Sequence, residues 1–217
     1  MPITPQRSTH GQATRQQLLD VAGQVFAERG FAEATSKEIC ARAGTNGAAV
    51  NYHFGGREQL YEAVLIEAHQ HLVQLEAMQR AAAMAGAPLD KLRAVLTGIV
   101  QRATAPDAHW ATRVLTRELL SPTAGAAVLA HKAVAPKVRV MMGIVSEVLG
   151  LPLDHPGLQR SLFLLMGPCM ALLIAPRPLR EEVLPLVATD PGALVDDMLC
   201  YAEAGLAAIA RRYAASP

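Results

Sequence analysis

Apolar residues near the start of the chain recur at the three- and four-residue spacing of an amphipathic helix. Over residues 14–29 this spacing produces one continuous apolar face. Thr14 and Gln17 have the spacing of a capping box, and Gly30 is suited to end the helix. The pattern therefore predicts a first helix over residues 14–29.

Two shorter helical patterns follow at close spacing. Thr35 and Glu38 form a second capping box before a short apolar pattern that stops at Gly44. Asn46 is a favourable N-cap residue for a third helix over residues 47–53. A turn of about three residues between the last two helices is the helix-turn-helix arrangement found in DNA-binding proteins.

Longer helical patterns begin after Gly55-Gly56. Apolar residues along one side predict a long helix over residues 57–83. Helix-length blocks separated by Pro and Gly predict further helices over residues 89–105, 107–120, 124–133, 136–149, 157–175 and 191–213. The whole pattern predicts an all-α protein with two domains. Residues 1–61 hold an N-terminal arm and the helix-turn-helix, with its core at 14–61, and residues 62–217 form a second helical domain.

Composition supports this class. The chain has 217 residues and 51% apolar residues, enough to bury a full core. Only 4% of the residues are aromatic, while Ala and Leu are plentiful, which favours helices over strands. The formal net charge is +1, so any argument for nucleic-acid binding depends on where individual charges lie.

Segments that direct a chain into or across a membrane are not expected. The polar start MPITPQRSTHGQATR lacks the apolar stretch of a signal peptide. The most apolar run, residues 162–175, is too short to span a bilayer and is interrupted by Gly167-Pro168. Three widely spaced cysteines, Cys40, Cys169 and Cys200, are interpreted as reduced thiols. We therefore expect a soluble, cytoplasmic protein with no membrane partner.

The predicted helix over residues 47–53 contains no Lys, Arg, Asp or Glu, and its first residues are small. Gly47, Ala48 and Ala49 at its first turn would let the backbone approach the floor of the DNA major groove. Free amides expected at residues 46–49, together with the helix dipole, also suit a phosphate. Donor side chains around the helix are suited to contact phosphates from two sides.

We therefore expect this region to bind double-stranded DNA. The expected contacts are Thr35, Ser36, Lys37, Asn46, Gly47, Ala48, Ala49, Asn51, Tyr52, His53 and Arg57. The alternative that spacing alone leaves open is a plain helical hairpin with solvated polar ends.

The stretch EICARAGTNGAAVNYHFGGREQL, within residues 14–61, resembles the N-terminal domain of the TetR family of transcriptional regulators. The family pattern runs through a capped first helix, the turn I-A-x-x-A-G-V-S and the closing Y-x-x-F-x-x-K-x-x-L. The spacing of Phe54, Arg57 and Leu60 is the same here. The chain departs from the pattern at Asn51, where the family usually has tyrosine, and at Gly47, which lacks a side chain that often reaches a base. The resemblance implies that DNA faces Ser36, Lys37, Gly47, Ala48, Ala49, Asn51, Tyr52, His53 and Arg57.

A second stretch resembles one branch of the same family. HWATRVLTRELLSPTAG, residues 109–125, and the proline-interrupted apolar helix after it are similar to the C-terminal domain of the CerR-like branch. NGAAVNYHFGGREQLY also resembles that branch. The family resemblance implies dimerisation through two helices of the second domain, which form a four-helix bundle with those of the partner.

A carboxylate on an apolar helix face has two interpretations. Helical spacing places Glu118 on the same face as apolar residues of the predicted helix over residues 107–120. One interpretation is a structural ion pair between Glu118 and an arginine. The other is a pocket for a small hydrophobic effector, supported by a kink expected at Gly167-Pro168. Its expected residues are Trp110, Arg113, Arg117, Glu118, Met166 and Met170.

An apolar stripe near the C-terminus is too wide for one neighbouring helix, and its small residues permit close packing. We expect an isologous homodimer contact there. The expected interface residues are Leu194, Met198, Ala202, Gly205, Leu206 and Ile209.

No spacing typical of an enzyme is present. The sequence lacks HExxH, GxSxG, P-loop, CxxC and dinucleotide-binding patterns, so we expect no catalytic residues, no metal and no cofactor. We expect a sequence-specific DNA-binding regulator, a homodimeric repressor that a small effector releases from a palindromic operator. The alternative is a helical protein-interaction adaptor without DNA binding.

Overall fold

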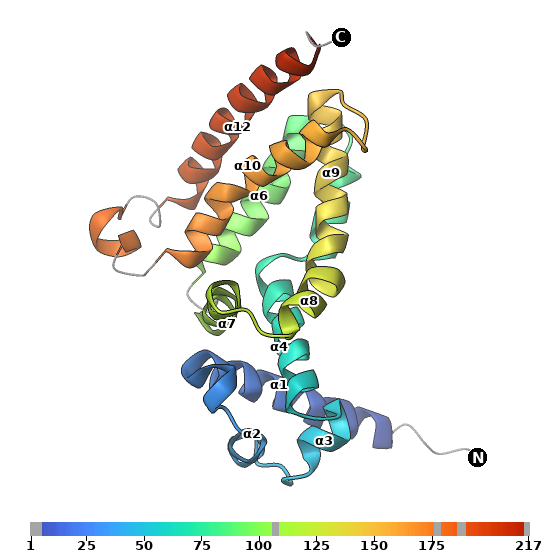
Figure 1. Ribbon diagram of the computed structural model, residues 1–217, viewed down its shortest axis with the longest axis vertical. Helices are drawn as coiled ribbons and strands as arrows, with labels where there is room; N and C mark the ends of the chain where they lie inside the picture. Colours follow the sequence, from blue (N-terminus) through green and yellow to red (C-terminus); the bar gives the residue numbers. More distant parts are fainter. Residues whose placement is uncertain (1–5, 106–108, 176–178, 186–189, 215–217) are drawn as a thin grey trace, which may run out of the picture. The chain divides into compact units, whose positions relative to one another are not determined.

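The computed structural model describes residues 6–105, 109–175, 179–185 and 190–214 (Figure 1). Over these residues the chain forms helices and no strand, and the predicted all-α class is confirmed. No helix among them is long and apolar enough to cross a membrane.

By packing, the chain falls into two compact units. The first unit consists of Met1–His69 and His109–Lys132, and the second of Gln70–Ala108 and Ala133–Pro217. The chain therefore passes between the units three times. These units are defined by packing and not by function. The predicted division into a DNA-binding domain, residues 1–61, and a second domain, residues 62–217, therefore stays a prediction.

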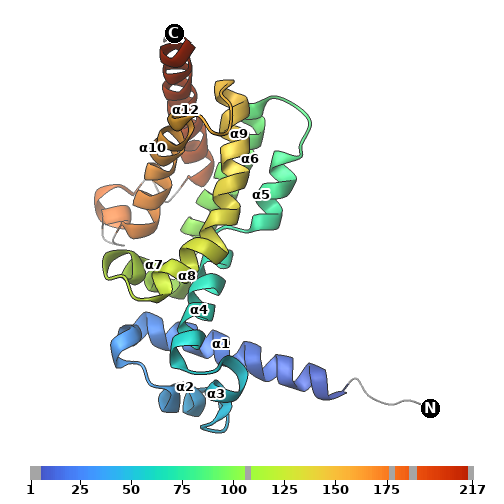
Figure 2. The same ribbon diagram turned by 45° about the vertical axis from the view of Figure 1, so that its right-hand side comes forward.

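The first unit contains the predicted helix-turn-helix. Its helices are α1 (Gln6–Glu33), α2 (Ser36–Arg42), α3 (Ala49–Phe54), most of α4 (Arg57–Leu72), α7 (His109–Leu120) and α8 (Gly125–Leu129). Figures 1 and 2 show α2 and α3 side by side on one side of α1. The predicted start of α7 at residue 107 lies outside the described residues.

Helix α1 begins earlier than its sequence indicated. It starts at Gln6, so Thr14 lies inside the helix and the predicted capping box with Gln17 is wrong. Instead, Gln17 Nε2 donates to the Ala43 carbonyl oxygen at 3.0 Å and joins α1 to the end of α2. The predicted stop is confirmed, because Gly30 takes a left-handed φ of 78° that breaks the helix.

The core of the first unit combines aliphatic and aromatic side chains. Leu18, Phe26, Ile39, Val50 and Leu60 are fully buried and come from α1, α2, α3 and α4. The short helices α2 and α3 thus depend on one apolar anchor or two each to hold them against α1 and α4.

The second unit is built on an aliphatic core. Its elements are α5 (Leu75–Ala82), α6 (Pro88–Thr104), α9 (Ala135–Leu149), α10 (Pro156–Ile174), α12 (Pro191–Ala214) and the π-helical turns η2 (Ala130–Val134, partly in the first unit) and η3 (Leu179–Val183). Helix α5 packs beside α6 and α9, and α12 packs on α6 and α10 (Figure 2). The bounds of α6, α10 and α12 lie within one residue of those predicted.

Three further predicted helix limits are wrong. The helix predicted over residues 47–53 begins at Ala49, so Gly47 and Ala48 precede it. The long helix predicted over residues 57–83 is broken, because Gln74 has extended angles of φ −88° and ψ 120° between α4 and α5. The helices predicted over 124–133 and 136–149 instead form one helical run from Gly125 to Leu149 through η2. Pro136 does not end this run because it stands in the first turn of α9, where its missing amide is tolerated.

Candidate DNA interface and ligand region

The start of α2 is fixed by the Thr35 half of the predicted capping box, while the Glu38 carboxylate pairs with Arg29 and Arg42. Thr35 Oγ1 accepts a hydrogen bond from the Glu38 amide at 3.2 Å, and Thr35 has extended backbone angles. This contact sets Ser36 and Lys37 in the first turn of α2. The side chain of Lys37 is exposed, and that of Ser36 is partly exposed.

The turn between α2 and α3 is held by local hydrogen bonds. Asn46 Oδ1 accepts from the Ala48 amide at 2.9 Å and closes a local turn. The predicted N-cap at Asn46 is wrong, because α3 begins at Ala49 with Ala48 as its N-cap. The Ala49 amide donates to the Asn46 carbonyl oxygen, also at 2.9 Å. The prediction of free amides at residues 46–49 is therefore wrong for Ala48 and Ala49, and phosphate binding by those amides is not available.

The turn before α3 presents small residues, and α3 itself presents one exposed ring. Gly47 and Ala48 are exposed, and a Cβ placed on Gly47 would meet no atom within 4 Å. Tyr52 is 85% exposed and contacts His53 edge to face, with ring centroids 4.9 Å apart. Asn51 is exposed on the same short helix, and Gly55 ends the helix with a left-handed φ of 90°.

Arg57 is held within the protein by three contacts. Its Nη1 donates to the Ala34 carbonyl oxygen at 3.0 Å, and its guanidinium lies 4.4 Å from the centroid of the Phe31 ring. Its Nη2 is also 3.8 Å from a carboxylate oxygen of Glu58. These contacts fasten the start of α4 to the end of α1, so a DNA contact by Arg57 stays a prediction beside an observed structural role.

Ion pairs fasten α1 to α2 on the surface. Arg42 bridges Glu28 at 2.7 Å and Glu38 at 2.8 Å, while Arg29 pairs with Glu38 at 2.9 Å. All four side chains are at least partly exposed. The network fixes the orientation of α2 more than it adds stability, because exposed pairs contribute little.

The carboxylate of Glu118 is buried and fully engaged. Glu118 is 3% exposed, and its Oε2 accepts from the Tyr61 hydroxyl at 2.8 Å. Its Oε1 accepts from the Thr123 amide at 2.8 Å and from the Thr123 hydroxyl at 3.0 Å. The structural interpretation of Glu118 predicted an ion pair with an arginine. The partners of the carboxylate are instead Tyr61 and Thr123, through hydrogen bonds. The carboxylate thus connects α4, α7 and the start of α8.

Tyr61 shares this environment with two phenylalanines. Its ring centroid lies 4.8 Å from those of both Phe26 and Phe31. Burial raises the pKa of Tyr61, and the hydrogen bond to Glu118 raises that pKa further. Tyr61 therefore stays a neutral hydrogen-bond donor at physiological pH.

Trp110 and Arg117 pack α7 onto α1. A Cβ on Gly23 of α1 would lie 2.6 Å from the Trp110 ring, so the close approach requires glycine. Arg117 Nη2 donates to the Glu28 carbonyl oxygen at 3.3 Å, near the end of α1, where a positive charge is favourable. Sequence reasoning missed Gly23, although a glycine inside a predicted helix was the available signal.

The six residues expected to form a ligand pocket fall in different units. Trp110, Arg113, Arg117 and Glu118 belong to α7 in the first unit, whereas Met166 and Met170 lie on α10 in the second. Three of the four α7 residues have the packing or hydrogen-bonding roles just described, and Arg113 is exposed. Their role in ligand binding stays a prediction.

An apolar groove runs between α10 and α12 in the second unit. It has a volume of about 130 Å³, and its wall includes five of the six expected interface residues: Met198, Ala202, Gly205, Leu206 and Ile209. Leu194 instead packs against the core of the same unit. Ala202 and Leu206 are buried within the chain, while neighbouring Tyr201 is 76% exposed and Leu164 is 62% exposed.

Two family models match this chain. Residues 18–64 match the model for bacterial regulatory proteins of the tetR family. Residues 88–209, more than half of the chain, match the model for the C-terminal domain of the HTH-type transcriptional dual regulator CecR. Both predicted resemblances are confirmed: the N-terminal one to the TetR family, and the C-terminal one to a branch of that family, here the CecR branch. Such regulators are not enzymes, which also confirms the expectation that this chain is not one.

Individual proteins agree with these models. CecR of Shigella flexneri is 28% identical over 141 residues, which cover 61% of this chain and 63% of CecR. The chain spans less than two thirds of the length of the curated relatives it matches.

Solved structures with the same fold include two FadR proteins. The fatty acid degradation regulator FadR from Bacillus halodurans has a TM-score of 0.68 at 18% identity, covering 88% of this chain and 98% of that one. FadR from Bacillus subtilis in complex with stearoyl-CoA has a TM-score of 0.68 at 16% identity, with the same coverage. At these identities the likeness concerns the fold alone.

Proposed function

This chain belongs to the TetR family of transcription regulators, and from that premise we propose that it is a homodimeric repressor released from its operator by a small effector. The observation that carries the proposal is the exposed face of α2 and α3. A tyrosine that is 85% exposed stands there beside residues too small to block a groove. As a DNA-binding protein it would work in the cytoplasm, where bacterial DNA lies.

Lys37 and Tyr52 are the strongest candidates for DNA contacts on this face. Lys37 is exposed in the first turn of α2, where it is suited to a phosphate. Tyr52 offers a hydroxyl and an apolar ring to the groove. Thr35, Ser36, Asn46, Asn51 and His53 surround them, and Ala49 is partly covered.

Operator selection from genomic fragments, followed by salt titration, tests DNA binding. Lys37→Ala should lower the slope of log affinity against log salt by roughly 0.9 per lost phosphate contact in each subunit. Arg139→Ala, an exposed arginine on α9, is the matched control and should leave the slope unchanged. Failure of the wild-type chain to bind any fragment would favour the adaptor alternative.

Ala48→Asp tests whether this face approaches DNA closely. Ala48 is exposed, so the fold should accept aspartate. A carboxylate near the groove floor and the phosphates should abolish operator binding through repulsion. Circular dichroism checks that the variant is folded, and undiminished binding would contradict a groove-facing Ala48.

The groove between α10 and α12 supports the proposed dimer contact. Its exposed rim of Leu164 and Tyr201 is apolar and continues the stripe expected from sequence. Two such faces related by a twofold axis would form an isologous interface. The operator should then be an inverted repeat with half-sites about one helical turn or a little more apart.

Gly205→Glu is the sharpest test of that interface. Gly205 is exposed and a Cβ there meets no atom within 4 Å, so the subunit should still fold. Leu206 is a poorer choice because it is 4% exposed within its own chain. Sedimentation should find Gly205→Glu monomeric with weakened operator binding, and a dimeric variant would overturn the interface.

An apolar or amphiphilic effector is the proposed signal for release. FadR from Bacillus subtilis has been solved with stearoyl-CoA, which makes an acyl compound a reasonable first probe. A coupling free energy of about 1–3 kcal/mol between effector and DNA would be ordinary. Compounds that release DNA should change Trp110 fluorescence if α7 responds, and Arg113→Ala should then shift the inducing concentration without altering ligand-free DNA affinity.

A further inference from the structure

The break between α4 and α5 has no cause in the local sequence. Val73 and Gln74 separate the two helices, and Gln74 is extended. The surrounding residues HQHLVQLEAMQR contain neither proline nor glycine, the usual causes of a sharp break. Intrinsic propensity alone would support a continuous helix with more helical hydrogen bonds, so the packing of α5 on α6 and α9 holds the broken form.

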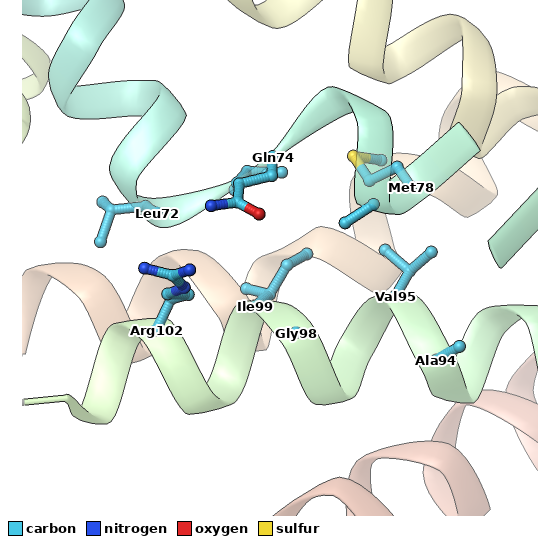
Figure 3. Close-up of a pocket in the computed structure, with 10 residues that line it drawn as sticks. Leu72, Gln74, Met78, Ala94, Val95, Gly98, Ile99 and Arg102 are labelled. Atoms are coloured by element: carbon cyan, nitrogen blue, oxygen red, sulfur yellow. The ribbon is translucent and has the colours of Figure 1, made fainter. Parts of the chain in front are cut away.

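A pocket opens at this break, between α5 and α6. Its volume is about 70 Å³, which encloses a few carbon atoms rather than a drug-sized molecule. The pocket is open to solvent beside the exposed Gly98 and Arg102, so a slightly longer chain can extend out of it. The apolar wall consists of Leu72, Val73, Ala77, Met78, Ala94, Val95 and Ile99. Figure 3 shows the Gln74 amide and the Arg102 guanidinium toward the Leu72 side, with Met78 and Val95 toward the other.

Gly98 forms part of the wall without any packing reason to be glycine. It lies inside α6, where glycine is less favourable than alanine. A Cβ on Gly98 would have no heavy atom within 4 Å, so no neighbour requires its absence. The missing side chain leaves the pocket open.

Arg102 brings a positive charge to the polar side of the pocket. The guanidinium is exposed, and the described residues include no ion pair to it. A guanidinium matches the geometry of a carboxylate, and the Gln74 amide can donate a further hydrogen bond. The pocket thus pairs an apolar interior with a site for one negative group.

We propose that this pocket binds a short monocarboxylate, with its hydrocarbon beside Gly98 and its carboxylate on Arg102 and Gln74. Bound ligand stabilises the broken arrangement of α4 and α5 over a continuous helix, because the pocket exists only when the helix is broken. As an effector site the pocket rests on the proposed repressor function, since α4 follows the DNA-facing α3 along the chain.

Calorimetric titration of the full chain without DNA tests the pocket by itself. Hexanoate should bind, hexanol should bind at least about tenfold more weakly, and hexylamine should not bind, because Arg102 selects a negative charge. Arg102→Gln should weaken hexanoate at least about tenfold. Equal binding of hexylamine, or unchanged affinity in Arg102→Gln, would overturn the proposal.

Glycine variants separate the pocket from general effects on helix stability. Gly98→Leu should abolish hexanoate binding, while Gly143→Leu on α9, where a Cβ also meets no atom within 4 Å, should leave it unchanged. Gly98→Ala and Gly143→Ala should each raise the thermal midpoint by about 2–4 °C, but only the first should weaken hexanoate. Hexanoate binding that survives Gly98→Leu would overturn the site.

Operator release is measured separately. Hexanoate should release wild-type protein from its operator and fail to release Gly98→Leu. If hexanoate bound in the calorimeter but did not release the protein from its operator, the effector role would be overturned. The pocket would still be a carboxylate-binding site. If the chain bound no DNA at all, the proposed repressor function would fail while the calorimetry still decided whether the pocket binds carboxylates.

Discussion

The two units of this protein are packed with different kinds of contact. In the first unit, the rings of Phe26 and Phe31 meet that of Tyr61, and the buried Glu118 carboxylate accepts hydrogen bonds from Tyr61 and Thr123. In the second unit, the apolar core consists of aliphatic residues, methionines and a cysteine, with a pocket beside α6 and a groove along α12. The buried polar side chains described there are Lys137 and Ser161, and no aromatic ring among the described residues joins that core. Hydrogen bonds depend on direction, so they favour one arrangement of the helices that they join. Aliphatic packing beside open space allows side chains and helices to shift at a smaller cost.

This difference fits the two tasks proposed for the chain. A DNA-reading surface must hold donors at fixed spacing, and hydrogen bonds between α4, α7 and α8 restrict how those helices can move. A ligand and dimer region must accept molecules that are not part of the chain. The following experiments test whether the first unit is the more rigid of the two.

The largest effect is expected from Glu118→Ala. Removing the carboxylate leaves the Tyr61 hydroxyl and the Thr123 amide without an acceptor and creates a cavity, so stability should fall by about 3 kcal/mol. Leu119→Ala, next in sequence and 55% exposed, should change stability by less than about 0.5 kcal/mol. Urea unfolding compares the two, and similar values would remove the case for a rigid first unit.

Gly23→Ala should be the next most damaging change. The new Cβ would lie 2.6 Å from the Trp110 ring, and the overpacking should cost about 1–3 kcal/mol. Trp110→Leu in the same chain should recover part of the loss, because the smaller side chain leaves room. If the stability changes of the two single variants simply added in the double variant, the Cβ introduced at Gly23 and the Trp110 ring would not be in steric conflict.

Arg57→Ala distinguishes a structural arginine from a DNA-binding one. Loss of the Ala34 hydrogen bond and the Phe31 contact should lower stability by about 1–2 kcal/mol. The salt slope of operator binding should then stay near the wild-type value, in contrast to Lys37→Ala. A slope reduced by roughly 0.9 per subunit, with unchanged stability, would instead assign Arg57 to a phosphate.

The smallest effect concerns Lys137, a buried lysine in the second unit. Burial lowers its pKa from about 10.5 to about 8, so above pH 8 the unfolded chain binds more protons than the folded one. Stability should therefore rise with pH between about 8 and 10.5, by about 1 kcal/mol from pH 8 to 9.

Comparison with Lys137→Met isolates this contribution. Burial raises the pKa of Cys169 to about 11, which opposes the trend equally in both proteins. Urea unfolding at pH 7, 8 and 9 should show the variant becoming relatively less stable as pH rises. A constant difference between the two proteins would show that Lys137 titrates normally.

Local signals in the sequence determined much of the helix map. The N-cap at Thr35 and the stop at Gly30 form as expected, since each depends on residues within one turn of the helix. The limits of α6 and α12 also follow from proline and apolar spacing close at hand. The residues proposed to contact DNA could be named for the same reason, because all but Arg57 lie within the short stretch from Thr35 to His53.

Tertiary structure alone decided which distant residues meet. Glu118 pairs with Tyr61, 57 residues away, and Arg117 reaches Glu28, 89 residues away. No local pattern specifies such partners, because the energy comes from groups that only the fold brings together. The same reason explains the break at Gln74, where local propensity favoured a continuous helix and packing in the second unit overrode it.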